Sequence, residues 1–122
     1  MAYTPKFQET AFTDGLNILA SEHFQFIEAG ATLDGVAIGD KVLPIGSLIA
    51  RNDTTGKFEE FSAVEGYSNF AITNYSIEVD GENDAILGEA IVRGSVYEAK
   101  LAGAVPAEFK AANPLIRYVS HV

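Results

Sequence analysis

The sequence predicts a mainly β protein with one short helix near the C-terminus. Two long stretches, residues 39–61 and 85–101, are rich in apolar residues that do not recur with the spacing of an amphipathic helix. Proline and glycine interrupt these stretches, as they do where strands bend or turn. Residues 105–114 instead carry the boundary signals of a helix. With 48% hydrophobic and 20% charged residues, the 122-residue chain is expected to fold as one ordered domain.

The first apolar stretch predicts a bend followed by a hairpin. Pro44 and Gly46 break its first apolar run, while Asn52–Gly56 supplies a polar turn that ends in a residue free to take positive φ. Loops of this length and composition commonly join hairpin strands. We therefore expect Ser47–Arg51 and Lys57–Phe61 to pair as antiparallel strands.

Strict alternation marks residues 71–79 as another strand. One face of this strand would carry mostly apolar side chains, and the other would carry mostly polar ones, although Ile72 falls on that second face. The face expected to be buried holds Ala71, Thr73, Tyr75, Ile77 and Val79.

An acidic cluster, Asp80–Asp84, follows this strand. Its oxygen-bearing side chains stand at alternate positions, as at the start of a calcium-binding loop, but that loop also needs glycine and glutamate where this chain has Ala85 and Ile91. The cluster is therefore interpreted as a hairpin turn between strands that end at Val79 and begin at Ala85. Weak calcium binding stays open at three carboxylates, those of Asp80, Glu82 and Asp84.

Two further strand candidates complete the β-rich part. They are Phe24–Ile27 and Ala85–Glu98, and in the second of them Gly88 and Gly94 indicate a bulge, a bend or a close approach of two backbones. Aromatic residues in such strands are expected to pack in the core. This expectation covers Phe24, Phe26, Phe58, Phe61, Phe70, Tyr75 and Tyr97.

The C-terminal region predicts a helix and a closing strand. Pro106 suits the first turn of a helix, Asn113 suits its end and Pro114 stops it. Leu115–Val119 then has room for one last strand.

The N-terminal segment has a different character. Residues 1–21 contain Pro5 and the turn signal Thr13–Gly15, and their apolar residues do not recur with the period of a helix or a strand. We therefore expect residues 1–21 to form an arm that is flexible when free, followed by a β-rich domain over residues 22–122. The chain does not begin with the pattern of a secretory signal, and no apolar run approaches the ~20 residues of a membrane span. We expect a soluble protein that does not bind membranes.

Charge argues against several classes of function. The net charge of −9 disfavours nucleic-acid binding, which depends on lysine and arginine. The absence of cysteine excludes disulfides, a thiolate nucleophile and Cys-based zinc sites. Residues 71–103 carry two cations and six anions, whereas residues 104–122 carry two cations and one anion. This unevenness fits either an ordinary solvated acidic surface or an acidic outer face with a less acidic docking face.

No arrangement of residues predicts catalysis. The two histidines, His23 and His121, are expected to be surface or interface residues, and no serine has the context of a nucleophile elbow. The glycines match neither G-x-G-x-x-G nor the P-loop. We expect a protein that is not an enzyme and that needs no cofactor or metal.

Three segments, in this order, resemble the lambda-type phage head decoration proteins, which are small capsid-stabilising subunits. They are Leu43–Ile49 with its Pro/Gly bend, the Thr-Gly-Lys-aromatic turn Thr55–Phe58, and the late strand Arg93–Leu101 with its Gly-x-apolar pattern. The pattern spans residues 31–119. The resemblance implies a β-clip-like fold, in which a bent double-stranded ribbon closes into a small incomplete barrel.

The resemblance also implies a function in the virion. Such a subunit is made in the host cytoplasm, forms a homotrimer and sits on the outer surface of the expanded phage head, where it clamps neighbouring subunits of the major capsid protein. Its chemistry is adhesion. Two alternatives stay open: another virion or surface assembly subunit, such as a tail or adhesion module, and a small ligand-binding or enzymatic β-domain, which would need a polar pocket with perturbed titratable groups.

Within this interpretation the N-terminal arm becomes the candidate capsid-binding element. Tyr3, Phe7 and Phe12 lie outside any clear amphipathic element and would be exposed on a free arm. Together with Pro5 they are the candidate site residues. The alternative is that the arm folds back as an edge strand on its own subunit.

Overall fold

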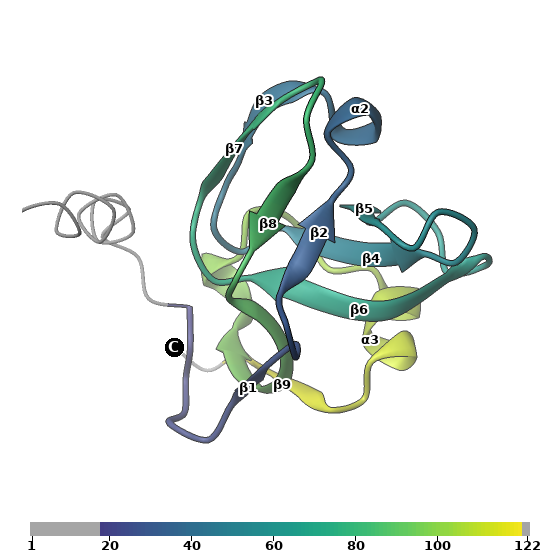
Figure 1. The fold of residues 1–122 in the computed structure, drawn as a ribbon. Helices are drawn as coiled ribbons and strands as arrows, with labels where there is room; N and C mark the ends of the chain where they lie inside the picture. Colours follow the sequence, from purple (N-terminus) through teal and green to yellow (C-terminus); the bar gives the residue numbers. More distant parts are fainter. Residues whose placement is uncertain (1–17, 121–122) are drawn as a thin grey trace, which may run out of the picture.

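The fold is mainly β, as predicted, and consists of a curled half-barrel sheet from which a two-stranded ribbon projects (Figure 1). It is seen in a computed structural model that describes residues 18–120. The strands are β1 (Gln25–Phe26), β2 (Ala31–Leu33), β3 (Asp40–Leu43), β4 (Leu48–Asn52), β5 (Phe58–Glu60), β6 (Tyr67–Thr73), β7 (Ile77–Asp80), β8 (Ala85–Leu87), β9 (Ala90–Tyr97) and β10 (Ile116–Val119). The helices are α2 (Gly35–Ile38), the 3₁₀ helix η1 (Glu98–Lys100) and α3 (Ala107–Ala112).

The strands of the half-barrel follow the order β1-β9-β6-β4-β5-β2-β8, and β10 adds to β9. Most neighbours are antiparallel, but β10 runs parallel to β9 and β2 runs parallel to β5. Strands β3 and β7 form a separate antiparallel pair. The short helix α2 was not predicted; the Asp34 carboxylate caps it by accepting a hydrogen bond from the Ala37 amide at 3.2 Å.

The separate pair is the continuation of the main sheet around a bend. Strands β3 and β4 run against β7 and β6, and the same five positions separate Leu43 from Leu48 on one side and Ile77 from Ile72 on the other. The register is therefore kept through the bend, which makes one bent double-stranded ribbon of the kind predicted. The predicted single strand over residues 71–79 is wrong in one respect, because the bend interrupts it after Thr73.

Buried polar groups hold the bend in place. The Thr73 hydroxyl, which is fully buried, accepts a hydrogen bond from the Ser47 amide and donates one to the Pro44 carbonyl, both at 3.0 Å. The Ser47 hydroxyl donates to the same carbonyl at 2.6 Å. Pro44 has no backbone N–H. The strand pairing can therefore be interrupted at this residue without leaving an amide donor unpaired.

Gly46 lets the bend pack against a distant part of the chain. Its φ of +86° lies in the region that favours glycine. A Cβ at this position would lie 2.9 Å from the Leu101 Cα, and the Gly46 carbonyl accepts a hydrogen bond from the Ala102 amide at 3.2 Å. Any side chain here would therefore push the bend away from the segment that follows η1.

The predicted hairpin is confirmed. Strands β4 and β5 pair antiparallel, and the Asn52 side chain organises their turn by accepting a hydrogen bond from the Thr54 amide at 2.8 Å. Gly56 closes the turn with a φ of +78°, as the sequence indicated.

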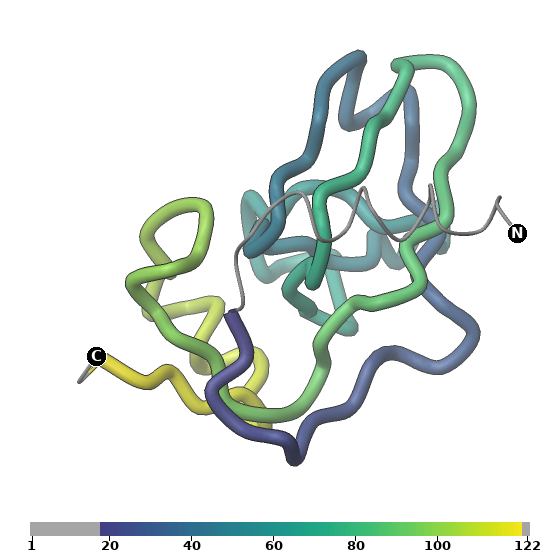
Figure 2. The backbone as a smooth tube through the Cα atoms, turned by 90° about the vertical axis from the view of Figure 1, so that its left-hand side faces the viewer, coloured from purple at the N-terminus to yellow at the C-terminus, as the bar shows by residue number. Residues whose placement is uncertain are grey.

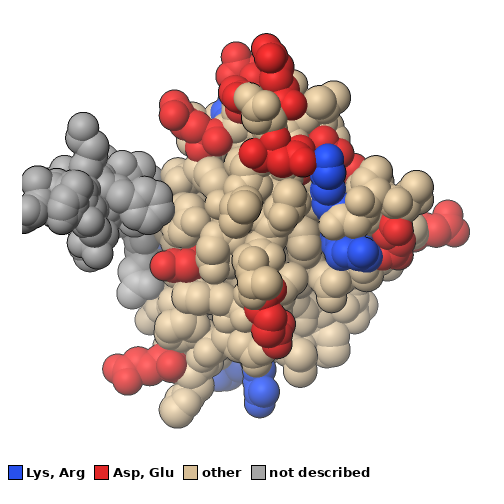
Figure 3. Space-filling view, viewed as in Figure 1, with Lys and Arg blue, Asp and Glu red and all other residues tan. Residues whose placement is uncertain are grey.

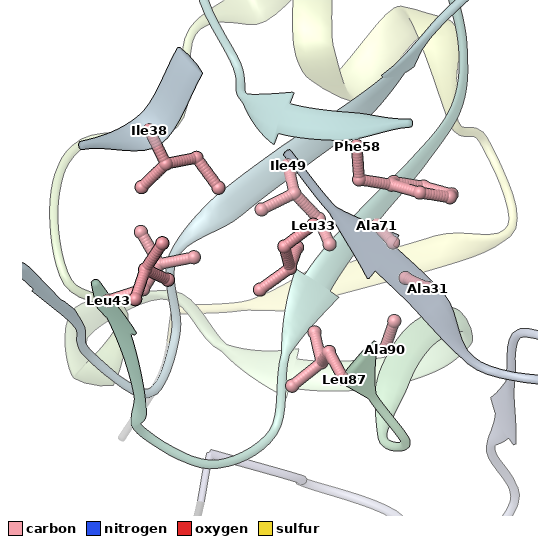
Figure 4. Close-up of a cluster of buried hydrophobic side chains, with 10 residues drawn as sticks. Ala31, Leu33, Ile38, Leu43, Ile49, Phe58, Ala71, Leu87 and Ala90 are labelled. Atoms are coloured by element: carbon pink, nitrogen blue, oxygen red, sulfur yellow. The ribbon is translucent and has the colours of Figure 1, made fainter. Parts of the chain in front are cut away.

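Two hydrophobic clusters fill the molecule. The first lies beneath β2 and β8, where Leu33, Leu43, Ile49 and Leu87 are fully buried (Figure 4). The second is built around Phe109 of α3, whose ring makes edge-to-face contacts with those of Phe61 and Phe70. The half-barrel is thus covered on both sides. This explains why Ile72 is fully buried although alternation placed it on the polar face of its strand.

The C-terminal helix and closing strand are confirmed, with Asn113 at the junction between them. The side chain of Asn113 is buried where β9 diverges from β6. Its amide nitrogen donates to the carbonyls of Phe70 at 2.7 Å and Val92 at 3.2 Å, and its oxygen accepts from the Leu115 amide at 3.1 Å. One side chain therefore joins α3, β6 and β9 and directs the chain into β10.

Candidate docking surfaces

The predicted arm is anchored to β9 at its last residues. Ile18 is fully buried, and its carbonyl accepts a hydrogen bond from the Tyr97 amide at 2.8 Å. Leu19 forms a β-bridge with Val96. The segment from Ile18 onward, which the sequence placed in the arm, is thus attached to the β-rich body. The candidate site residues Tyr3, Pro5, Phe7 and Phe12 lie outside the described residues.

Both ends of the described chain flank the same strand. β10 runs along the other edge of β9, where Val119 lies beside Tyr97. In Figure 2 the first and last described residues lie in the lower part of the molecule, away from the tip of the β3–β7 ribbon. The described chain therefore begins and ends beside β9, away from this tip.

The three-stranded sheet at this end exposes one face that the sequence analysis did not single out. Gln25 lies opposite Arg93 in the β1–β9 pair, and Arg117 lies beside Ser95 in the β9–β10 pair. Paired residues share a face, and so do residues two positions apart on a strand. Gln25, Arg93 and Arg117 are therefore neighbours on one face, and all three are exposed.

Leu115 extends this face, and Phe24 packs against Gly94 of the same sheet. The Leu115 carbonyl accepts a hydrogen bond from the Gly94 amide at 3.2 Å, and the Leu115 side chain is 61% exposed. A Cβ on Gly94 would lie 2.9 Å from the Phe24 Cβ, which confirms the predicted close approach of backbones. Phe24 is 41% exposed, so its predicted core position is wrong. We call Gln25, Arg93, Leu115 and Arg117 the arginine face.

The other aromatic residues that were predicted to pack in the core differ in how deeply they are buried. Phe58 and Phe70 are buried. The others are partly buried: Phe26, Phe61, Tyr75 and Tyr97.

The arginines of this face have no ionic partner among the described residues. The described ion pairs are Lys41–Glu60, Arg51–Asp53, Lys57–Asp84 and Lys110–Glu98. Glu28, which follows β1, accepts a hydrogen bond from the Gln25 amide group at 3.0 Å and makes no ion pair with either arginine. No carboxylate of residues 18–120 therefore neutralises Arg93 or Arg117 through an ion pair.

The opposite end of the molecule is acidic. Figure 3 shows Asp and Glu side chains gathered at the top, over the tip of the β3–β7 ribbon and the turn that follows it. A half-open depression of about 440 Å³ lies here, and we call it the acidic groove. The lining residues that carry its character are Asp40, Lys41, Val42, Glu78, Asp80 and Asp84.

Two carboxylates of the groove already accept hydrogen bonds from groups of the same chain. Asp80 accepts hydrogen bonds from the amides of Asn83 at 2.7 Å and Glu82 at 2.8 Å, and these bonds hold its pKa below the usual range. Asp84 accepts from Lys57 Nζ at 2.8 Å and from the Gly35 amide, which lowers its pKa as well. The described residues contain no cluster of three or more metal-ligating side chains. The structure thus lends no support to calcium binding here.

The predicted hairpin between Val79 and Ala85 is wrong. The turn itself exists, with Gly81 at a φ of +84°, but β7 pairs with β3 and β8 pairs with β2. The turn carries the chain from the ribbon to the half-barrel. Two apolar strands joined by an Asp-Gly turn need not pair with each other when each pairs with a different strand.

Neither histidine lies in a described catalytic arrangement. His23 is exposed, with its backbone amide bonded to the Ser21 hydroxyl at 3.0 Å, and His121 is outside the described residues. Among residues 18–120, no helix is both long and apolar enough to cross a bilayer.

Comparison with known proteins brings no relative. Neither the protein-family models, nor the curated proteins, nor the solved structures contain a match to this chain. Any function must therefore be inferred from the residues and the geometry described above.

Proposed function

We propose that this protein is a phage head decoration subunit. It binds the outside of the expanded capsid as a homotrimer and stabilises the lattice by clamping neighbouring subunits of the major capsid protein. The observation that carries the proposal is the bent double-stranded ribbon, because its bend is formed by Leu43–Ile49, the first of the three segments on which the resemblance to decoration proteins rests.

Each of these segments has a structural role in the ribbon or beside it. Leu43–Ile49 forms the bend, and Thr55–Phe58 closes the β4–β5 hairpin, where the Thr55 hydroxyl accepts a hydrogen bond from the Lys57 amide at 3.2 Å. Arg93–Leu101 forms the second half of β9 and η1. The first and last of these segments meet where Gly46 packs on Leu101. Two of the three segments, which are far apart in the sequence, are thus in contact in the fold, as expected if they act together in one motif.

The site where the arm is anchored fits the same function. The arm joins the body through Ile18, which is buried, so a force on the arm is passed to β9. A subunit that binds only the expanded lattice stabilises that lattice by mass action, without any chemical step. The acidic groove is half open, and Asp80 and Asp84 are already bonded, so it offers little to a ligand-binding or enzymatic β-domain.

The function is tested by heating heads with and without the protein. At a free concentration 100 times the Kd, each bound site would stabilise the lattice by about 2.7 kcal/mol. We therefore expect expanded heads to release their DNA at a higher temperature when the protein is present, and the shift to grow with protein concentration. Heads that open at the same temperature at every concentration would contradict the proposal.

A further inference from the structure

We propose that Asp84 is an acid-sensitive clasp, which holds the tip of the β3–β7 ribbon to the half-barrel while its carboxylate is ionised and releases the tip when the carboxylate is protonated. The bend at the other end of the ribbon stays closed throughout. The clasp acts within one chain, so it does not depend on the proposed function.

Two segments connect the tip of the ribbon to the half-barrel. Residues 34–39, which include α2, lead from β2 into β3, and residues 81–84 lead from β7 into β8. Figure 1 shows α2 at the top of the molecule, near the tip of the ribbon, and α2 contacts β3, β5 and β7. The two connecting segments lie against each other, because a Cβ on Gly35 would overlap with the Asn83 carbonyl oxygen.

The Asp84 carboxylate binds both connecting segments to a third one. One of its oxygens accepts a hydrogen bond from the Gly35 amide at 3.3 Å, and the other forms an ion pair with Lys57 Nζ at 2.8 Å. Lys57 belongs to the Thr-Gly-Lys-aromatic turn and comes directly before β5. One carboxylate therefore ties the segment before β3, the segment before β8 and the β4–β5 hairpin together.

Both bonds favour the ionised form of this carboxylate. The hydrogen bond from Lys57, and then the one from the Gly35 amide, hold the pKa of Asp84 below 3.8, the ordinary value for aspartate. A carboxylate whose pKa is lowered by folding stabilises the folded arrangement above its ordinary pKa, and this contribution is lost as the pH falls through the lowered pKa. The clasp should therefore be closed at neutral pH and open in acid.

The clasp can open without unfolding the core. The side chains of Lys57 and Asp84 are 42% and 35% exposed, and exposed ion pairs contribute little to global stability. The bend depends on a different kind of bond, because the Ser47 amide donates to the buried Thr73 hydroxyl at 3.0 Å. A hydroxyl carries no charge that acid could remove. The ribbon is thus held by uncharged hydrogen bonds at its bend and by a carboxylate near its tip.

Other charged groups surround the clasp and must be separated from it. Asp34 lies near Lys57 and caps α2 through the Ala37 amide. The groove that contains Asp84 is also lined by Asp40, Lys41, Glu78 and Asp80. Asp40 and Asp80 lie opposite each other across the ribbon, and their repulsion weakens when they are protonated, which opposes release of the tip. Variants of the clasp residues themselves are therefore needed.

A pH titration followed by NMR provides the test. In the wild type we expect the Gly35 amide resonance to shift with a midpoint below pH 3.8, while the Ser47 amide stays constant. Hydrogen exchange, corrected for its intrinsic pH dependence, should accelerate over the same range at Gly35 and not at Ser47. K57M removes the ion pair and should move the Gly35 midpoint to higher pH. D84N keeps an acceptor for the Gly35 amide but cannot titrate, so it should abolish this step.

K110M is the matched control for K57M. Lys110 forms an ion pair with Glu98 at 2.9 Å, and its side chain is 39% exposed, close to the 42% of Lys57. K110M changes the net charge as K57M does, but its pair joins η1 and α3, so the Gly35 midpoint should stay at the wild-type value. Circular dichroism checks that each variant folds, and K57Q replaces K57M if that variant does not.

Three results would overturn the clasp. The first is a Gly35 midpoint that K57M leaves unchanged, and the second is a Gly35 step that survives in D84N. The third is a Ser47 amide that loses protection at the same pH as the Gly35 amide, because the chain would then unfold as a whole rather than open at the tip.

Discussion

Deleting residues 2–14 should weaken binding to expanded heads by at least about 100-fold, since several anchoring residues and their backbone would be lost together. We expect the arm to add a strand to an exposed sheet edge of the capsid protein, with Tyr3, Phe7 and Phe12 as anchors. The same deletion should leave the melting temperature and the oligomeric state nearly unchanged. The described body begins with the buried Ile18, which the deletion spares.

The measurement is a titration of heads with full-length and truncated protein, together with thermal unfolding of both. A variant that keeps the arm backbone but replaces Tyr3, Phe7 and Phe12 with alanine separates the aromatic anchors from strand pairing. The arm hypothesis fails if the truncated protein decorates heads as tightly as the full chain. It fails equally if the truncation lowers the melting temperature strongly, because the arm would then belong to the core.

Gly46→Ala should destabilise the protein by about 2–5 kcal/mol. A side chain at this positive φ costs ~1–2 kcal/mol, and overpacking against backbone adds ~1–3 kcal/mol. The added Cβ would meet the Leu101 Cα at 2.9 Å, where only backbone could move. Urea unfolding at one fixed protein concentration measures the change, as a lower midpoint with an unchanged slope.

Gly66→Ala is the matched control for this substitution. Gly66 has a φ of +84°, close to that of Gly46, but a Cβ there would meet no atom within 4 Å. It should therefore cost only the ~1–2 kcal/mol of backbone strain. Equal losses at the two glycines would show that the contact between the bend and Leu101 contributes nothing to stability.

Short sequence motifs were sufficient to predict those turns and helices that interactions between near neighbours in the sequence determine. The turn at Asn52–Gly56 and the helix between Pro106 and Asn113 were predicted because side-chain capping and fixed φ angles act within a few residues. The bend at Pro44 and Gly46 was predicted for the same reason.

Strand partners and burial on the second face could not be predicted in this way. β7 pairs with β3 rather than β8 because the register of the bent ribbon continues from β4 and β6, which depends on residues far apart in the sequence. The alternation of apolar and polar residues along one strand identifies only one of its faces as buried. It could not show that α3 covers the other face, where Ile72 contributes to the cluster around Phe109.

The arginine face was missed because it exists only in the folded sheet. Gln25, Arg93 and Arg117 come from three segments that become neighbours through the pairing of β1, β9 and β10. The sequence did show that the C-terminal residues are less acidic than residues 71–103. It offered no means of placing Arg93 beside Arg117, or of showing that neither forms an ion pair with any of residues 18–120.

Counting bound copies tests the central claim most directly. Purified protein is mixed with decoration-free heads in the expanded and unexpanded states, the heads are sedimented, and the protein on each is quantified. We expect saturable binding to expanded heads, in a copy number divisible by three, and little binding to unexpanded heads. No binding to expanded heads at any protein concentration would contradict the decoration function.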